Sequence, residues 1–348
     1  MKTFFDAIKL TFVILGGIIG GGFVSGKELS VFFGGISGTE TIIVLSVCYL
    51  TSFTAILLPE RENARTEKQK KYDDVFSIGL LFSAFISFSL MVSAYENVLK
   101  EYLGSYSIFL LVPCMGMAAR LAVKGTAAAE KTNVILTGAV VTAIVAFSFD
   151  GIIAPLNGKV TIIGGLNGLF YVFMNAFVNC FAIRRAKKGK NKKSAAIAVI
   201  LSTIILVFLT ILVLKKITKA ETMDKELPLL SSVNEKFKIA FSLIMLAAIF
   251  TSAVSAYFPI ADKAKEMYGG GFIVNAVIIA AAFLFARAGM ERVIKYGYPI
   301  IGVIGGAFIT TEWINFIRLR KNTNKRLTKF SRIDILTMLK KAPCGKGR

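Results

Sequence analysis

Apolar residues fall along this chain in near-continuous runs of about twenty, separated by short polar links. A soluble domain this apolar would carry these residues in short amphipathic periods. Because about twenty apolar residues in a helix cross the hydrocarbon core of a bilayer, the runs predict an all-α membrane protein. We predict ten transmembrane helices, over residues 4–34, 41–58, 75–99, 106–123, 128–149, 160–183, 195–214, 239–260, 272–286 and 293–317.

The first run contains the most unusual stretch of the chain, Gly-Gly-Ile-Ile-Gly-Gly-Gly-Phe-Val-Ser-Gly-Lys-Glu at residues 16–28. Each glycine costs a helix about 1 kcal/mol relative to alanine, so the three at residues 20–22 disfavour a continuous helix. Unpaired backbone at membrane depth is tolerated where it lines a cavity, and we therefore predict a broken helix whose carbonyls and amides face a small ligand. Close helix packing through small residues is the alternative.

Ten spans divide into two sets of five, and an odd number in each set gives the second set the opposite orientation in the membrane. This division predicts a 5+5 inverted repeat, with one repeat over residues 4–149 and the other over residues 160–317. Helix 6 should then break at the same depth as helix 1, near Asn175, which is a polar residue at the centre of an apolar run. Alternatively, Asn175 and Asn179 form hydrogen bonds across a helix interface.

The net charge of +21 comes from basic residues that lie mostly in short loops between the apolar runs. Membrane orientation explains this distribution better than binding of nucleic acid does, because lysine and arginine concentrate in cytoplasmic loops. Their distribution predicts that both termini are cytoplasmic, together with a basic tail over residues 318–348. The lysine-containing segment 215–236, which this topology places outside, fits the rule worst.

The residue types argue against an enzyme. The chain has no histidine and no G-x-S-x-G nucleophile motif, and Cys48, Cys114, Cys180 and Cys344 lie too far apart to suggest a metal site. We therefore expect no catalytic residues, bound metal or cofactor. The expected partners are the lipid bilayer and a small-molecule solute.

The eighth run carries hydroxyl side chains at Thr251, Ser252 and Ser255. Hydroxyl oxygens suit a small monovalent cation when carbonyls from a broken helix complete its ligand shell. Hydroxyls in membrane helices also commonly donate to the carbonyl four residues earlier, and this alternative stays open.

The Gly-Gly-Gly-Phe-Val-Ser-Gly-Lys-Glu motif at residues 20–28, followed by two phenylalanines, resembles the first-span signature of the YkvI-like bacterial membrane proteins, which is close to GxGFASGQE and FF. That family resembles the amino acid-polyamine-organocation (APC) superfamily, whose members have the LeuT-type fold. Tyr171 with Asn175, and Phe-Thr-Ser at residues 250–252, are similar to it as well. The similarity extends over essentially all ten spans, and the first motif is its specific part.

This resemblance implies a symporter, that is, secondary transport of an amino acid or related amine across the bacterial cytoplasmic membrane, with Na⁺ as one possible coupling ion. The residues expected to bind the solute are Gly20, Gly21, Gly22, Phe23, Ser25, Tyr171 and Asn175. The residues expected to bind the cation are Gly20, Gly22, Thr251 and Ser252.

Lys27 and Glu28 follow the break, and Lys27 stands where the family usually has glutamine. We expect these two residues to form a gate or, through Glu28, to couple transport to protons instead of sodium. A sensor of the same fold, which binds the solute without transporting it, is the second class of function. Measurement of solute flux separates the two classes.

Overall fold

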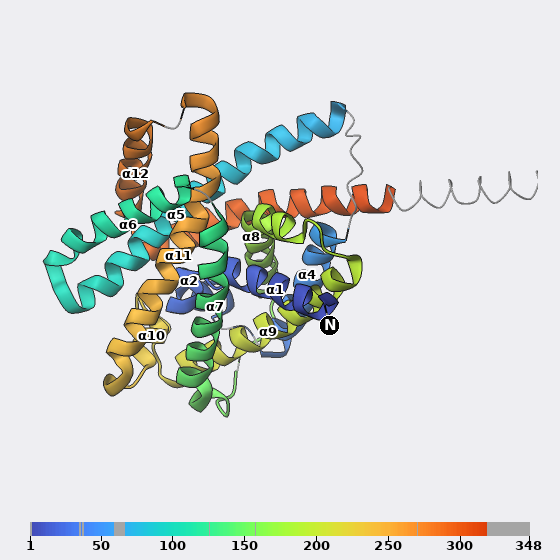
Figure 1. The fold of residues 1–348 in the computed structure, drawn as a ribbon. Helices are drawn as coiled ribbons and strands as arrows, with labels where there is room; N and C mark the ends of the chain where they lie inside the picture. The colour runs from blue at the N-terminus through green and yellow to red at the C-terminus, as the bar shows by residue number, and fades with distance from the viewer. Residues whose placement is uncertain are drawn as a thin grey trace, which may run out of the picture.

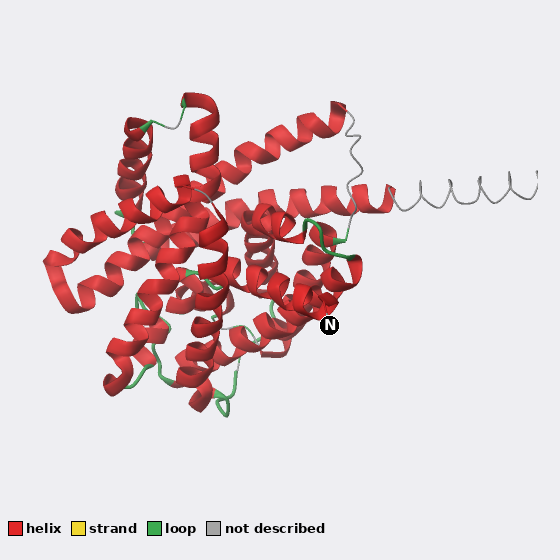
Figure 2. Ribbon diagram, viewed as in Figure 1, coloured by secondary structure: helices red, strands yellow, loops and turns green. Residues whose placement is uncertain are grey.

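A computed structural model describes residues 2–318 of the protein, except residues 35, 37, 59–66, 125, 157 and 270. Within this part of the chain, helices are joined by short loops (Figures 1 and 2), and strand-like pairing is limited to one isolated bridge between Ile36 and Lys159. The prediction of an all-helical protein is confirmed for these residues. The basic tail predicted at residues 318–348 lies, after Arg318, outside the described residues.

The helices follow the predicted apolar runs in order. They are α1 (Lys2–Ile18), α2 (Gly21–Ser25), α3 (Lys27–Phe33), α4 (Gly38–Leu57), α5 (Glu67–Leu103), η1 (Gly104–Tyr106), α6 (Ser107–Lys124), α7 (Thr126–Ser148), η2 (Phe149–Gly151), α8 (Ile162–Lys187), α9 (Lys192–Lys219), α10 (Pro228–Ser232), α11 (Glu235–Tyr268) and α12 (Phe272–Ala286). A final helical segment, Met290–Arg318, begins with α13 (Met290–Arg292) and the π-helical turn η3 (Val293–Gly297) and is called the last helix below.

Six helical segments of the described chain are long and apolar enough to cross a membrane. They are Gly38–Leu57, Asp74–Val123, Ile162–Lys187, Lys192–Lys219, Glu235–Tyr268 and Met290–Arg318. The apolar helices Leu136–Gly151 and Phe272–Ala286 are shorter, and α1 has 17 residues. These segments support a multi-pass membrane protein, whereas the count of ten spans and the inverted repeat stay predictions.

The first predicted span is interrupted twice. α1 ends at Ile18, and Gly20 then takes an extended conformation with φ −92° and ψ −170°. After the short helix α2, Gly26 adopts a left-handed conformation with φ 80° and ψ −6°, which glycine reaches without steric cost. The glycine-rich stretch therefore breaks the helix, as its sequence predicts.

The predicted break in helix 6 is wrong, because α8 runs without interruption from Ile162 to Lys187. Asn175 donates from Nδ2 to the carbonyl of Tyr171 at 3.0 Å, and Asn179 donates in the same way to the carbonyl of Asn175 at 2.9 Å. Each side-chain amide is thus bonded within its own helix. These amide groups need neither a helix break nor a donor bond across a helix interface.

Helices from the two halves of the chain pack against each other in the core. α1 and α4 both contact α8 and α9, while α5 contacts α11 and α12. In Figure 1, α1 and α2 lie in the middle of the bundle, among α7, α9 and α11, and α1 contacts all three of these helices. All five residues of α2 are buried, so the break lies inside the protein.

The lysines at the end of α9 are held by the connection between α7 and α8. Lys216 Nζ lies 2.7 Å from both carboxylate oxygens of Asp150. Lys215 and Lys219 donate to the carbonyls of Ile152 and Asp150, at 2.7 and 2.8 Å. Three lysines of segment 215–236, the segment that fits the predicted topology worst, therefore make contacts within the protein.

Cysteine labelling at the two ends of α9 tests the predicted topology. Ala220 and Lys193 are both exposed. In a variant without the native cysteines, we expect Ala220→Cys to react with a membrane-impermeant maleimide on intact cells and Lys193→Cys to react only after permeabilisation, because α9 should enter the bilayer from the cytoplasm. Equal amounts of both variants in the membrane fraction are the control, and the reverse labelling pattern would contradict the topology.

Candidate solute-binding site

The break in the first span is packed between α5 and α11. A Cβ atom on Gly20 would lie 3.2 Å from Oγ of Ser252 in α11. A Cβ atom on Gly21 would lie 2.8 Å from Ile249 in α11 and 3.0 Å from the sulfur of Met91 in α5. These glycines therefore permit both the irregular backbone and the close approach of two neighbouring helices.

Glu28 of α3 lies next to the break. Its carboxylate contacts Gly22, where an added Cβ atom would overlap it. Its Oε1 accepts a hydrogen bond of 2.9 Å from the hydroxyl of Tyr298 in the last helix. From the sequence, Glu28 is expected beyond the break. The left-handed turn at Gly26 sets the direction of α3 relative to α2 and brings the Glu28 side chain back to the break.

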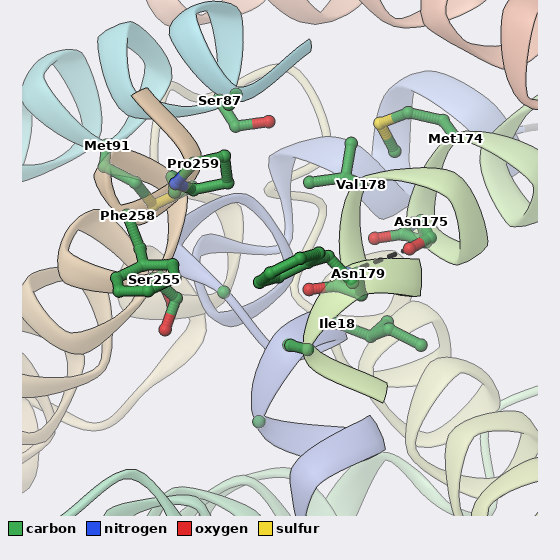
Figure 3. A pocket seen from close by; sticks show the side chains of 18 of the residues that line it. Ile18, Ser87, Met91, Met174, Asn175, Val178, Asn179, Ser255, Phe258 and Pro259 are labelled. Atoms are coloured by element: carbon green, nitrogen blue, oxygen red, sulfur yellow. Dashed lines mark hydrogen bonds between the residues drawn. The ribbon is translucent and has the colours of Figure 1, made fainter. Parts of the chain in front are cut away.

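A cavity of about 90 Å³ borders the break (Figure 3). Its walls come from α1, the break, α3, α5, α8, α11 and the last helix. The side chains that give it a polar character are Glu28, Ser87, Asn175, Asn179, Ser252, Ser255 and Tyr298. The cavity is thus a small chamber among several helices, with polar groups set into a mostly apolar wall.

Of the seven residues predicted to bind the solute, Gly20 and Asn175 line this cavity. The other five pack around it in the described structure, outside the lining: Gly21, Gly22, Phe23, Ser25 and Tyr171. Ser25 has a local role, because its hydroxyl donates to the carbonyl of Gly22 at 2.8 Å and accepts from the backbone amide of Lys27 at 3.2 Å. It stabilises the turn between α2 and α3.

Tyr171 belongs to a buried aromatic cluster. Its ring packs on Phe32 and Phe33, with centroid distances of 5.4 and 5.3 Å. Phe32 also stacks on Tyr298, at 6.3 Å. This cluster holds in place the tyrosine whose hydroxyl contacts the carboxylate of the cavity.

The residues predicted to bind a cation are brought together in part. Ser252 lines the cavity beside Gly20, and Ser255 lines it one turn later. The hydroxyl of Thr251 donates to carbonyls three and four residues earlier in its own helix, at 3.0 and 3.3 Å. Ser252 and Ser255 are therefore the hydroxyl groups of α11 that border the cavity.

Lys27 has different surroundings from Glu28, the next residue. Its Nζ lies 2.9 Å from the carboxylate of Glu291 and 3.4 and 3.1 Å from the carbonyls of Asp224 and Lys225. The side chain of Lys27 is 4% exposed, whereas that of Glu291 is 51% exposed. Lys27 thus connects α3 to the segment between α9 and α10 and to the last helix.

Sequence reasoning missed Tyr298 and Ser87 as cavity residues. Tyr298 lies 270 residues after its partner Glu28 and directly follows the π-helical turn η3. A π-helical turn changes which side chains of a helix face its neighbours, and the sequence carries no spacing that reveals it. Ser87 is one of several serines in α5, and its neighbours do not distinguish it.

The fold of this chain is similar to that of a solved membrane transporter. One match is to the structure of MHP1, a nucleobase-cation-symport-1 family transporter, in a closed conformation with bromovinylhydantoin bound. It has a TM-score of 0.52 and 12% sequence identity, and it covers 88% of this chain and 71% of that chain. At this identity, the likeness concerns the fold alone. No protein-family model and no curated protein sequence matches this chain, so membership of the YkvI-like family stays a prediction.

Replacing Gly22 by alanine tests the packing of Glu28. The new methyl group would overlap the Glu28 carboxylate, so the side chain must move and its hydrogen bond with Tyr298 must weaken. We expect the free energy of unfolding to fall by about 1–3 kcal/mol, which is the usual cost of overpacking. Thermal unfolding of the purified protein measures this change. Gly116→Ala is the control, because nothing lies within 4 Å of its added methyl group, and equal melting temperatures for the two variants would refute the expectation.

Replacing Lys27 by methionine tests the link between α3 and the segment at residues 220–227. The variant leaves two carbonyls and Glu291 without their lysine partner. We expect amide hydrogen exchange in this segment to become about tenfold faster, because the loss of such contacts lowers the free energy of local opening. Lys238→Met, which breaks a 2.9 Å ion pair with Glu101, is the matched control. Exchange at the wild-type rate in Lys27→Met would exclude this role.

Proposed function

We propose that this protein is a secondary transporter that carries a small solute across the bacterial cytoplasmic membrane. The observation that carries the proposal is the cavity at the break of the first span, enclosed by several helices of a membrane bundle. Side chains from different helices can bind a solute together and separate when the helices move. The similarity of the fold to that of a transporter supports the same conclusion.

The two sides of the cavity are closed by different interactions. On one side, Lys27 connects α3 to the last helix and to the segment between α9 and α10. Toward the basic end of α8, the cavity residues Phe181 and Phe258 lie with ring centroids 6.3 Å apart, and the guanidinium of Arg185 lies 5.8 Å from the Phe258 ring. A solute would cross the protein when one side opens while the other remains closed.

The proposal includes a LeuT-type arrangement of ten spans in two inverted repeats, with both termini in the cytoplasm. The order of the helices and the break in the first span support this arrangement. The start of α1 also lies beside the start of α9, because the hydroxyl of Ser194 in α9 donates to the carbonyl of Thr3 in α1 at 2.9 Å. The N-terminus and the basic segment before α9 therefore lie on the same side.

The proposed solute is an amino acid or a related amine, on the basis of the similarity of the first motif to the YkvI-like proteins. The proposed coupling ion is Na⁺, bound near Gly20 by backbone carbonyls and by the hydroxyls of α11. Proton coupling is the second candidate, and the buried carboxyl of Glu28 beside Tyr298 favours it. A sensor without transport activity is the alternative in function.

Flux measurements in liposomes test transport against sensing. Purified protein is reconstituted into liposomes loaded with one amino acid or amine at a time, and uptake of the same labelled compound from outside is followed. Uptake above that of protein-free liposomes supports transport. A compound that stabilises the purified protein against heat but shows no flux would support a sensor instead.

Single alanine variants test the proposed sodium site. Because Ser252 lines the cavity and the Thr251 hydroxyl is bonded within its own helix, we expect Ser252→Ala to lower the affinity for Na⁺ at least tenfold and Thr251→Ala to change it less than threefold. Stabilisation by Na⁺ relative to K⁺, at constant ionic strength, measures the affinity. An equal response to Na⁺ in wild type and Ser252→Ala would remove this site.

A further inference from the structure

Glu28 is the one charged side chain that lines the cavity in the described part of the chain. It is buried, and its carboxylate accepts a hydrogen bond from a neutral hydroxyl, that of Tyr298. A carboxylate inside an apolar protein is stabilised by a cation that enters its site. The electrostatics of the cavity therefore favour a positively charged ligand.

The two asparagines of the cavity present acceptor groups. Nδ2 of Asn175 and Nδ2 of Asn179 both donate to backbone carbonyls of α8. Their Oδ1 atoms remain as acceptors, and Oδ1 of Asn179 lies against Gly17, another residue of the cavity wall. In Figure 3, both side chains lie on the wall opposite Ser255 and Phe258. Acceptor oxygens suit an ammonium group, which has three donors and no acceptor.

Among the described residues that line the cavity, there is no basic side chain to pair with a solute carboxylate. Lys27 is the nearest basic residue along the chain, and its Nζ is engaged by Glu291 and by the carbonyls of Asp224 and Lys225. A carboxylate in the cavity would instead meet the like charge of Glu28. This arrangement disfavours a zwitterionic amino acid relative to an amine of the same length.

The volume of the cavity limits the size of its ligand. About 90 Å³ is room for several water molecules, since one water needs about 10–15 Å³ of such space. A ligand of a few non-hydrogen atoms fits this space.

We infer that the cavity binds a small primary ammonium ion, such as methylammonium or ethylammonium, in preference to an amino acid. Its ammonium group donates to the carboxylate of Glu28 and to asparagine and serine oxygens of the wall, and its alkyl group contacts the apolar lining. The inference rests on the site of the proposed function and narrows the solute of that site to a cationic amine. Glu28 is then the residue that determines specificity.

Three ligands of related shape test this inference on the wild-type protein. Ethylammonium is compared with ethanol, which has the same number of non-hydrogen atoms and no charge, and with glycine, which adds a carboxylate. Isothermal titration at constant ionic strength measures binding of each. We expect ethylammonium to bind at least tenfold more tightly than either of the others, and equal or tighter binding of glycine would overturn the inference.

Two variants then test whether the charge of Glu28 is responsible for binding ethylammonium. Glu28→Gln keeps the shape of the side chain and removes its charge, and we expect ethylammonium to bind about 10- to 100-fold more weakly. Glu101→Gln removes a carboxylate outside the cavity, where it pairs with Lys238, and should bind ethylammonium as the wild type does. Thermal unfolding shows whether both variants are folded. If Glu28→Gln does not fold, the comparison of the three ligands on the wild-type protein tests the inference.

Wild-type affinity for ethylammonium in a folded Glu28→Gln variant would overturn the inference. If solute uptake depends on pH in the wild type and loses this dependence in Glu28→Gln, Glu28 is identified as a proton site instead. The liposome measurements separate this failure from that of the proposed function. Flux of glycine without flux or binding of ethylammonium would support the proposed transport function and overturn the inference. Binding of ethylammonium without flux of any solute would support the inference and overturn the proposed transport function.

Discussion

Backbone polar groups inside a membrane bundle have no water to bond with, so a helix can be broken there only where protein or a ligand cavity surrounds the break. In this chain, the break falls between α5 and α11, with α2 wholly buried. The short helices restore much of the bonding, since the amide of Val24 donates to Gly20 and that of Ser30 donates to Gly26, each at 2.9 Å. Glycine supplies both the required dihedral angles and the space for the neighbouring helices. The cavity, the site of Glu28 and the course of α3 all follow from this one requirement.

Lys27 and Glu28, two adjacent residues of opposite charge beyond the break, contact different parts of the protein. Successive residues of a helix point about 100° apart, so Lys27 and Glu28 at the start of α3 cannot face the same neighbours. Glu28 meets Tyr298 at the cavity, whereas Lys27 meets the last helix at Glu291. Both side chains therefore contact the same helix at different levels. A movement of the last helix relative to α3 would change both environments together, which links the interior of the cavity to the contacts that cover it.

Local physical rules allow the apolar helices and the break in the first span to be predicted from the sequence, because run length and glycine content act within a few residues. They fail where the outcome depends on tertiary structure. Asn175 suggests a second break, yet its amide bonds within an intact helix. The position of Glu28 depends on the dihedral angles of Gly26, and its partner Tyr298 is distant in sequence and follows a π-helical turn. Gly20, Asn175 and Ser252 are nevertheless predicted site residues that line the cavity.

The cluster around Asp150 bears on how membrane orientation is read from sequence. The positive-inside rule describes lysines that are free to interact with lipid head groups and with the insertion machinery. Lys216 is 10% exposed and shares its charge with Asp150, while Lys215 and Lys219 are directed toward backbone carbonyls. In the folded protein these residues join two connections, and Asp150 offsets one of their three positive charges. A topological count that gave less weight to lysines with partners in the fold would reduce the conflict between this segment and cytoplasmic termini.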